Sequence, residues 1–209
     1  MDGVPGARKG ILFDMKVRAI VWAGTVALWA QSAPVTVSLS APTKGPVELT
    51  IRNHGRAAVT AYAVTVTYTA NRSAASQDLI WDSVLQLSAP ELQPNEAAIR
   101  RVPVSPVNAA VTLRAVVFAD GRTSGDAAWV GRIMTGRRFA LATVDGVRKI
   151  LPAKAEDQEA AHQQMLAAAD GPEQKKLVDA YYRLAVPNHA RDLDLLHARL
   201  AGAVTLAAN

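Results

Sequence analysis

The fold class is decided by residues 47–68, which have the sequence VELTIRNHGRAAVTAYAVTVTY. Apolar and polar side chains alternate over residues 47–52 and again over residues 59–68, with a change of phase near Ala63. Alternation with a period of two is typical of strands that bury one face, and the β-branched residues in both runs favour the same structure. Residues 53–55, Asn-His-Gly, predict a turn between the two strands, because Asn and Gly tolerate positive φ.

Further strands are predicted on both sides of this pair. They are expected at residues 35–40, 79–85, 98–104, 111–119 and 123–127. Proline cannot donate a hydrogen bond to a neighbouring strand, so Pro103 places the strand at 98–104 on the edge of a sheet. Residues 71–77 are polar and are predicted to be irregular, and Asp120-Gly121 predicts a tight turn.

Short strands separated by frequent turn signals predict an antiparallel β-sandwich of immunoglobulin-like architecture. The chain has no cysteine. The disulfide that joins the two sheets of antibody domains is therefore absent, and thiolate metal sites, a cysteine nucleophile and a lipid-attachment cysteine are excluded. Trp81 is expected to help fill the interior of the sandwich.

After Asp126 the period of the apolar residues changes to that of a helix. They recur at Trp129, Ile133, Leu141, Val144, Val147 and Leu151. This stripe predicts an amphipathic helix over residues 128–150, which Pro152 ends.

Three more helices are expected in the last third of the chain. The first spans residues 156–169, and the second begins at Asp170-Gly171-Pro172, where proline suits the first helical turn. The third begins at Asn188, a capping residue, and runs to about residue 203. The predicted fold class is therefore α+β, with an antiparallel immunoglobulin-like β-sandwich domain over residues 33–127 and a C-terminal helical region of about four helices over residues 128–209.

Residues 19–30 form an apolar stretch, AIVWAGTVALWA, without a charged residue. A basic segment precedes it and small residues follow it, which are the three parts of a secretory signal. We predict a signal peptide over residues 1–32 with cleavage near Ser32. The protein is accordingly expected to be exported, and periplasmic or extracellular.

Alternatives remain for this N-terminal segment. Met15 directly precedes Lys16, and translation from Met15 would give a signal of more usual length. The apolar stretch is short for a bilayer core of ~30 Å, which needs roughly 20 residues. It would nevertheless anchor the protein in a membrane if it stayed uncleaved, and a buried core segment is a third interpretation.

Several short motifs carry a resemblance to a known family. They are Asn53-x-Gly55, Thr60-Ala61-Tyr62, the proline-rich stretch 90–106 and Phe118-x-Asp120-Gly121-x-x-x-Gly125-Asp126. With these motifs, residues 33–127 resemble the immunoglobulin-like domains of exported bacterial proteins, of the CARDB kind related to cell adhesion. The resemblance implies an interaction or spacer module without catalysis, and it carries no functional residue to transfer.

The histidines do not form a metal-binding pattern. They stand at His54, His162, His189 and His197. His189, Asp192 and His197 are expected on one face of the last helix. His189 and His197 are more than two helical turns apart, about 12 Å, which is too far for one ion without other ligands. His54 is expected to be solvated in a turn.

The basic residues of the long helix are the most visible charged feature. They are Arg132, Arg137, Arg138, Arg148 and Lys149. We interpret them as the solvated side of an amphipathic helix. The alternative is a surface for anionic lipid, polysaccharide or nucleic acid, although nucleic acid is disfavoured because no aromatic residues are interleaved.

Three other short patterns have simple structural interpretations. Arg100-Arg101 is expected to protect an edge strand. Asn71-Arg72-Ser73 matches a glycosylation acceptor. Asp120 and Asp126 lack the ladder of alternating oxygen ligands of a calcium loop, so a turn is expected there.

No nucleophile elbow, phosphate loop, zinc-protease motif or dinucleotide fingerprint occurs in the sequence. We therefore assign no catalytic, cofactor-binding or metal-binding residue. The leading hypothesis is a non-catalytic exported module that binds an unknown protein or cell-envelope partner and no nucleic acid. The alternatives are a sandwich-fold hydrolase or carbohydrate-acting enzyme and a membrane-tethered structural spacer, and only an uncleaved N-terminus would bring membrane contact.

Overall fold

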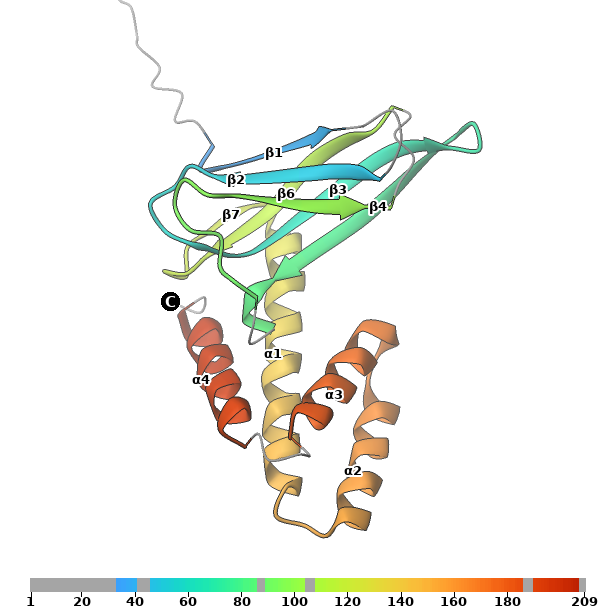
Figure 1. The fold of residues 1–209 in the computed structure, drawn as a ribbon, viewed down its shortest axis with the longest axis vertical. Helices are drawn as coiled ribbons and strands as arrows, with labels where there is room; N and C mark the ends of the chain where they lie inside the picture. Colours follow the sequence, from blue (N-terminus) through green and yellow to red (C-terminus); the bar gives the residue numbers. More distant parts are fainter. Residues whose placement is uncertain (1–32, 41–45, 86–88, 104–107, 186–189, 207–209) are drawn as a thin grey trace, which may run out of the picture. The chain divides into compact units, whose positions relative to one another are not determined.

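The computed structural model describes residues 33–40, 46–85, 89–103, 108–185 and 190–206 (Figure 1). Within them, seven β-strands precede four α-helices, as the α+β prediction requires. The predicted signal peptide, Met15 and the predicted cap Asn188 lie outside the described residues.

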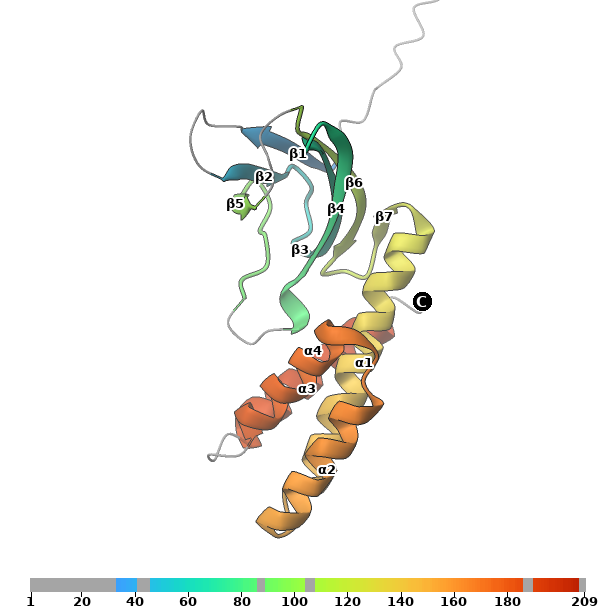
Figure 2. The ribbon, with the colours of Figure 1, turned by 90° about the vertical axis from the view of Figure 1, so that its right-hand side faces the viewer.

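The strands form two antiparallel sheets. Their bounds are β1 Val35–Ser40, β2 Val47–Asn53, β3 Val59–Ala70, β4 Ser73–Asp82, β5 Ala97–Val102, β6 Ala110–Phe118 and β7 Thr123–Gly125. One sheet has the order β1-β2-β5 and the other the order β4-β3-β6-β7. The chain crosses from one sheet to the other between β2 and β3, between β4 and β5 and between β5 and β6, which confirms the predicted architecture. Figure 2 shows the two sheets as facing layers.

The interior of the sandwich is built from the alternating residues of both sheets. It buries Val47, Leu49 and Ile51 of β2 against Val64 and Val66 of β3, among others. The predicted change of phase near Ala63 is wrong, because β3 pairs with β4 without a register shift from Ala61 to Ala70. The side chains of β3 alternate regularly there, so Ala61 and Ala63 pack on the opposite side of the sheet from Val64. The register of β3 against β6 shifts at this point because Arg114 of β6 is an extra residue.

Two other predictions for the middle of the chain are also wrong. Residues 73–77 are not irregular but belong to β4, which pairs with β3 over its whole length. Asn71 and Arg72 form the turn of this hairpin with φ of 50° and 65°, the conformation of a two-residue type I′ turn. Val84 and Leu85 are not in a strand but in a 3₁₀ helix, η1, at Ser83–Leu85.

The four helices are α1 Ala127–Ile150, α2 Ala155–Ala168, α3 Gly171–Ala185 and α4 Ala190–Leu206. Asp126 caps α1, because its Oδ1 accepts a hydrogen bond of 2.8 Å from the backbone N–H of Ala128. A second hydrophobic core lies between the helices and includes Val144, Tyr181, Leu193 and Leu196. None of the helices in the described part of the chain has the length and apolar character needed to span a bilayer.

Helix α1 joins the β-sandwich to the other helices. Its Ile133 packs on a small-residue surface of the sheet β4-β3-β6-β7, formed by Ala61, Ala63, Ala115 and Val117. Alanine side chains let a helix approach the sheet closely. Val84 of η1 also packs in the helical core, so the sheets and the helices belong to one compact unit.

Candidate functional site

A buried ion pair fixes the junction between the sheet and α1. Arg137 Nε donates to Asp82 Oδ2 at 2.7 Å, and Arg137 Nη2 donates to Asp82 Oδ1 at 3.1 Å. The side chains of Arg137 and Asp82 are only 1% and 2% exposed. The prediction that Arg137 lies on a solvated helix face is therefore wrong. The residue lies on the buried side of α1 because it has a carboxylate partner there.

Other polar groups of this junction are also hydrogen-bonded. Arg137 Nη2 donates to Thr60 Oγ1 at 2.9 Å. Asp82 Oδ1 accepts from the backbone N–H of Val84 at 3.0 Å, and Ser83 Oγ donates to the carbonyl of Thr60 at 3.1 Å. Asp82 thus holds both α1 and the first residues of η1, so one carboxylate sets the positions of two elements.

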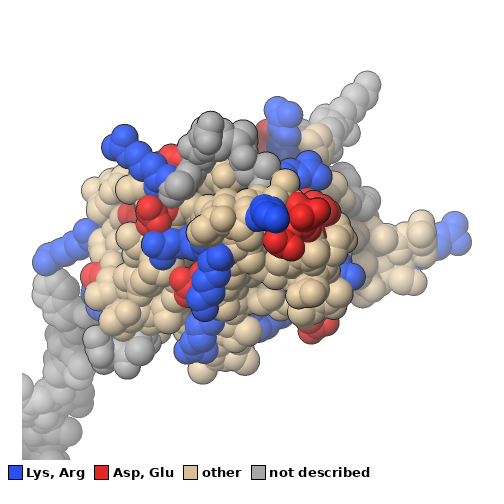
Figure 3. Space-filling view, turned by 90° about the horizontal axis from the view of Figure 1, so that it is seen from below, with Lys and Arg blue, Asp and Glu red and all other residues tan. Residues whose placement is uncertain are grey.

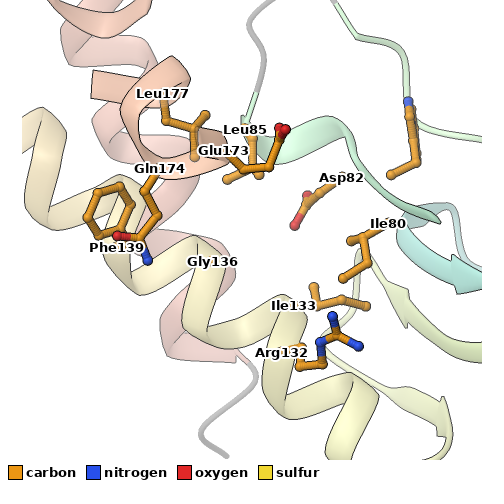
Figure 4. A pocket seen from close by; sticks show the side chains of 11 residues that line it. Ile80, Asp82, Leu85, Arg132, Ile133, Gly136, Phe139, Glu173, Gln174 and Leu177 are labelled. Carbon is orange, nitrogen blue, oxygen red and sulfur yellow. The ribbon is translucent and has the colours of Figure 1, made fainter. Parts of the chain in front are cut away.

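A groove opens beside this ion pair, between β4, η1, α1 and α3 (Figure 4). Its volume is about 350 Å³. It is lined by Ile80, Trp81, Asp82, Leu85, Arg132, Ile133, Gly136, Phe139, Glu173, Gln174 and Leu177. Most of these side chains are apolar, and Ile80 at the edge strand is 44% exposed. The groove therefore offers apolar surface to a ligand.

The charged groups of the groove already have partners. Arg132 Nη1 lies 3.7 Å from Asp78 Oδ2, and its guanidinium lies 4.2 Å from the ring centroid of Trp129. Lys176 Nζ lies 2.8 Å from Glu173 Oε1. Asp82 faces Arg137 as described above. These pairings leave the groove suited to recognition by apolar contact more than to acid–base chemistry.

Tyr181 of α3 supports the wall of the groove. Its hydroxyl donates to the carbonyl of Leu85 at 3.0 Å. Burial raises the pKa of the Tyr181 phenol above its ordinary value, and the nearby charge of Asp82 raises it further. The phenol thus stays protonated and keeps η1 against α3.

The three histidines that the structure describes do not come together. His54 is exposed, with Nε2 3.0 Å from Thr36 Oγ1, and His197 Nε2 lies 3.0 Å from Asp145 Oδ1. His162 is buried and stacks on Tyr182 with ring centroids 3.9 Å apart. His189 lies outside the described residues. In the described ranges, no three His, Asp or Glu side chains are grouped so as to hold a metal ion.

The other basic residues of α1 are at the surface. Arg138 and Lys149 are exposed, and Arg148 Nη2 lies 2.9 Å from Asp194 Oδ1 on α4. On the face seen in Figure 3, Lys and Arg side chains lie among Asp and Glu side chains. Basic side chains therefore do not form a single patch on that face.

Trp81 closes the side of the sandwich between the two sheets. It is partly buried, and it stacks on Tyr62 with ring centroids 5.3 Å apart. Arg100 of β5 lies 5.3 Å from the Trp81 ring. The predicted edge position of β5 is confirmed, because this strand ends its sheet, and Arg101 is exposed.

Sequence reasoning missed the burial of Arg137, its partner Asp82 and the groove itself. The available signal was the position of Arg137, because Ile133, Arg137, Ala140, Val144 and Val147 are spaced three or four apart along the buried side of α1. An arginine within such a stripe indicates a buried anionic partner. The sequence gives no indication that this partner is Asp82, which precedes Arg137 by 55 residues.

The fold and the groove define a class: a β-sandwich carrying a helical subdomain, with an apolar groove at their junction. No family model, curated protein or solved structure matches the chain. Its function must accordingly be inferred from the chemistry of the groove, because a sandwich fold alone hosts many functions.

Proposed function

We propose that this protein is a non-catalytic binding module whose junction groove receives an apolar part of a protein or cell-envelope partner. The predicted signal peptide adds the expectation that binding takes place outside the cytoplasm. The resemblance to the CARDB kind of domain agrees with an interaction module and remains a prediction.

One observation carries the proposal: the groove is lined mostly by apolar side chains, and one of them, Ile80, is 44% exposed. Its volume of about 350 Å³ is at the lower end of the range for ligand sites, which suits one or two bulky apolar side chains. Burying exposed apolar surface is the main source of affinity at such sites.

The groove gives less support to a hydrolase. Such an enzyme needs two carboxylates placed for acid–base work or a nucleophile beside a base. The two carboxylates lining the groove, Asp82 and Glu173, are paired with Arg137 and Lys176. None of the residues lining it is a histidine, serine or threonine.

Site-specific photo-crosslinking tests the proposal. A photoreactive amino acid is placed at Ile80 in the groove or at Ile99, which is 60% exposed on β5 and serves as the control. After illumination of producing cells, we expect a discrete adduct from position 80 that position 99 does not give. Equal labelling at both positions, or no adduct at position 80, would contradict binding in the groove.

A further inference from the structure

Strand β4 is an unusually open sheet edge beside the groove. It has 10 residues, whereas the other end strands β1, β5 and β7 have 6, 6 and 3 residues. Among the described strands it pairs only with β3. Its outer edge therefore presents a row of backbone N–H and C=O groups that a further strand can pair with.

The side chains of β4 do not protect this edge. Proteins usually protect such edges with lysine, proline or a bulge, but β4 has the sequence SAASQDLIWD and pairs with β3 without a register shift. By contrast, β5 carries Arg100 and Arg101 and is followed by Pro103. The acidic Asp78 of β4 is itself engaged by Thr65 and Arg132.

The open edge of β4 lies next to the groove, so one bound segment can contact both. Ile80 lies near the end of β4 and lines the groove. In a pair of strands, residues directly opposite each other point to the same face. On a strand added to β4, the side chain opposite Ile80 would therefore lie on the side of the sheet where Phe139 of α1 and Leu177 of α3 line the groove.

From this juxtaposition we infer that the partner binds as an extended polypeptide strand that adds to β4 and inserts one bulky apolar side chain into the groove. The inference rests on the proposed function and names its partner class. Backbone hydrogen bonds to β4 give the affinity of such a complex, and the groove selects the side chain, as in other cases of strand addition.

A second copy of this chain does not fit the same place. In an antiparallel pair of two β4 strands that uses at least eight of their ten residues, residues 73–77 of one copy lie opposite Ile80 of the other. These residues are Ser, Ala, Ala, Ser and Gln, and none of them has a bulky apolar side chain to fill a groove of about 350 Å³. The bulky residues of β4 all lie at its C-terminal end, so self-pairing leaves the groove unfilled.

The test uses a random dodecapeptide library displayed on phage, selected against the full chain. We expect the selected peptides to alternate apolar and polar residues, to lack a central proline and to contain one bulky apolar position. Ile80→Lys should weaken their binding by about tenfold or more. The matched variant Ile99→Lys, on the edge of the other sheet, should change it less than about twofold.

Hydrogen exchange of the backbone amides of residues 73–82, measured with and without a selected peptide, then distinguishes the outcomes. Slower exchange along β4 supports strand addition. Peptides that lose binding in Ile80→Lys but leave β4 exchange unchanged would overturn strand addition and leave the groove as the binding site. If the selected peptides bind Ile80→Lys as tightly as the unaltered protein, or if no peptide is selected, both the inference and the proposed function would be overturned. If the protein is a dimer that the substitution Ile80→Lys dissociates, the groove is occupied by a second copy of the chain, and the inference would be overturned.

Discussion

The interior of the sandwich and the junction below it are held by different forces. Between the two sheets, the packed side chains are branched aliphatics such as Leu49 and Ile51 and the aromatics Tyr62 and Phe118. Where the sheet β4-β3-β6-β7 meets α1, three of the four buried side chains on the sheet are alanines, and a charged pair, Asp82–Arg137, lies beside them.

This difference shows how tightly each region fixes the positions of its elements. Apolar burial is non-directional, so the sandwich interior tolerates exchanges of similar volume. A bidentate ion pair has a fixed geometry, so the junction sets where α1 and η1 lie against the sheet. The groove lies between these elements, and its form therefore depends on the ion pair more than on the sandwich interior.

The largest expected effect comes from removing one partner of the pair. Arg137→Met leaves the Asp82 carboxylate buried without its cation, and we expect the free energy of unfolding to fall by about 3–5 kcal/mol. Urea unfolding monitored by circular dichroism measures it. The control Arg138→Met removes the exposed neighbouring arginine and should change stability by less than about 0.5 kcal/mol. Similar losses for both variants would show that the buried pair does not fix the junction.

A smaller effect is expected from enlarging the alanine surface. Ala63 is fully buried beneath α1, so Ala63→Val forces the helix away from the sheet and should lower the unfolding free energy by about 1–3 kcal/mol. The control Ala74→Val changes an exposed residue of β4 and should be near neutral. If Ala63→Val is also neutral in the same urea titration, the close approach of α1 to the sheet is wrong.

The smallest effect concerns Tyr181 and depends on pH. Burial and then the charge of Asp82 raise its pKa above the ordinary value of 10.0. In the unfolded chain the Tyr181 phenol loses its proton near the ordinary pKa of 10.0, whereas in the folded chain it keeps the proton. The contribution of the Tyr181 phenol to stability is therefore fully present below about pH 10. That contribution declines as the pH rises above about 10.

Tyr181→Phe removes this titration together with the hydrogen bond to Leu85. At neutral pH we expect the variant to lose about 0.5–1.5 kcal/mol of stability. Thermal unfolding between about pH 8 and pH 11 should then show a shallower decline for the variant than for the unaltered protein. Parallel curves for the two proteins would contradict the raised pKa of Tyr181.

The sequence predicts most of the fold, because alternation and helical stripes report which residues are buried. It fails at β4, where residues 73–77 are Ser, Ala and Gln and have little preference for strands. That strand forms because β3 is long enough to pair with it at ten positions. Local sequence cannot show such a tertiary cause.

The candidate site was less predictable than the fold. An arginine in a helix is ordinarily solvated, so a pattern-based interpretation assigns Arg137 to the surface together with Arg138. Its true environment depends on Asp82, which lies on a strand distant in the sequence. The groove is formed by residues of β4, η1, α1 and α3 together, so only the assembled structure brings its lining together.

The most direct test of the central claim, that the Asp82–Arg137 pair fixes the junction, is a double-mutant cycle. Unfolding free energies are measured by urea titration for the unaltered protein, Asp82→Asn, Arg137→Met and the double variant. We predict a coupling energy of about 1.5–3 kcal/mol, with the double variant more stable than the sum of the single changes implies. Additivity of the two changes within about 0.5 kcal/mol would contradict the claim.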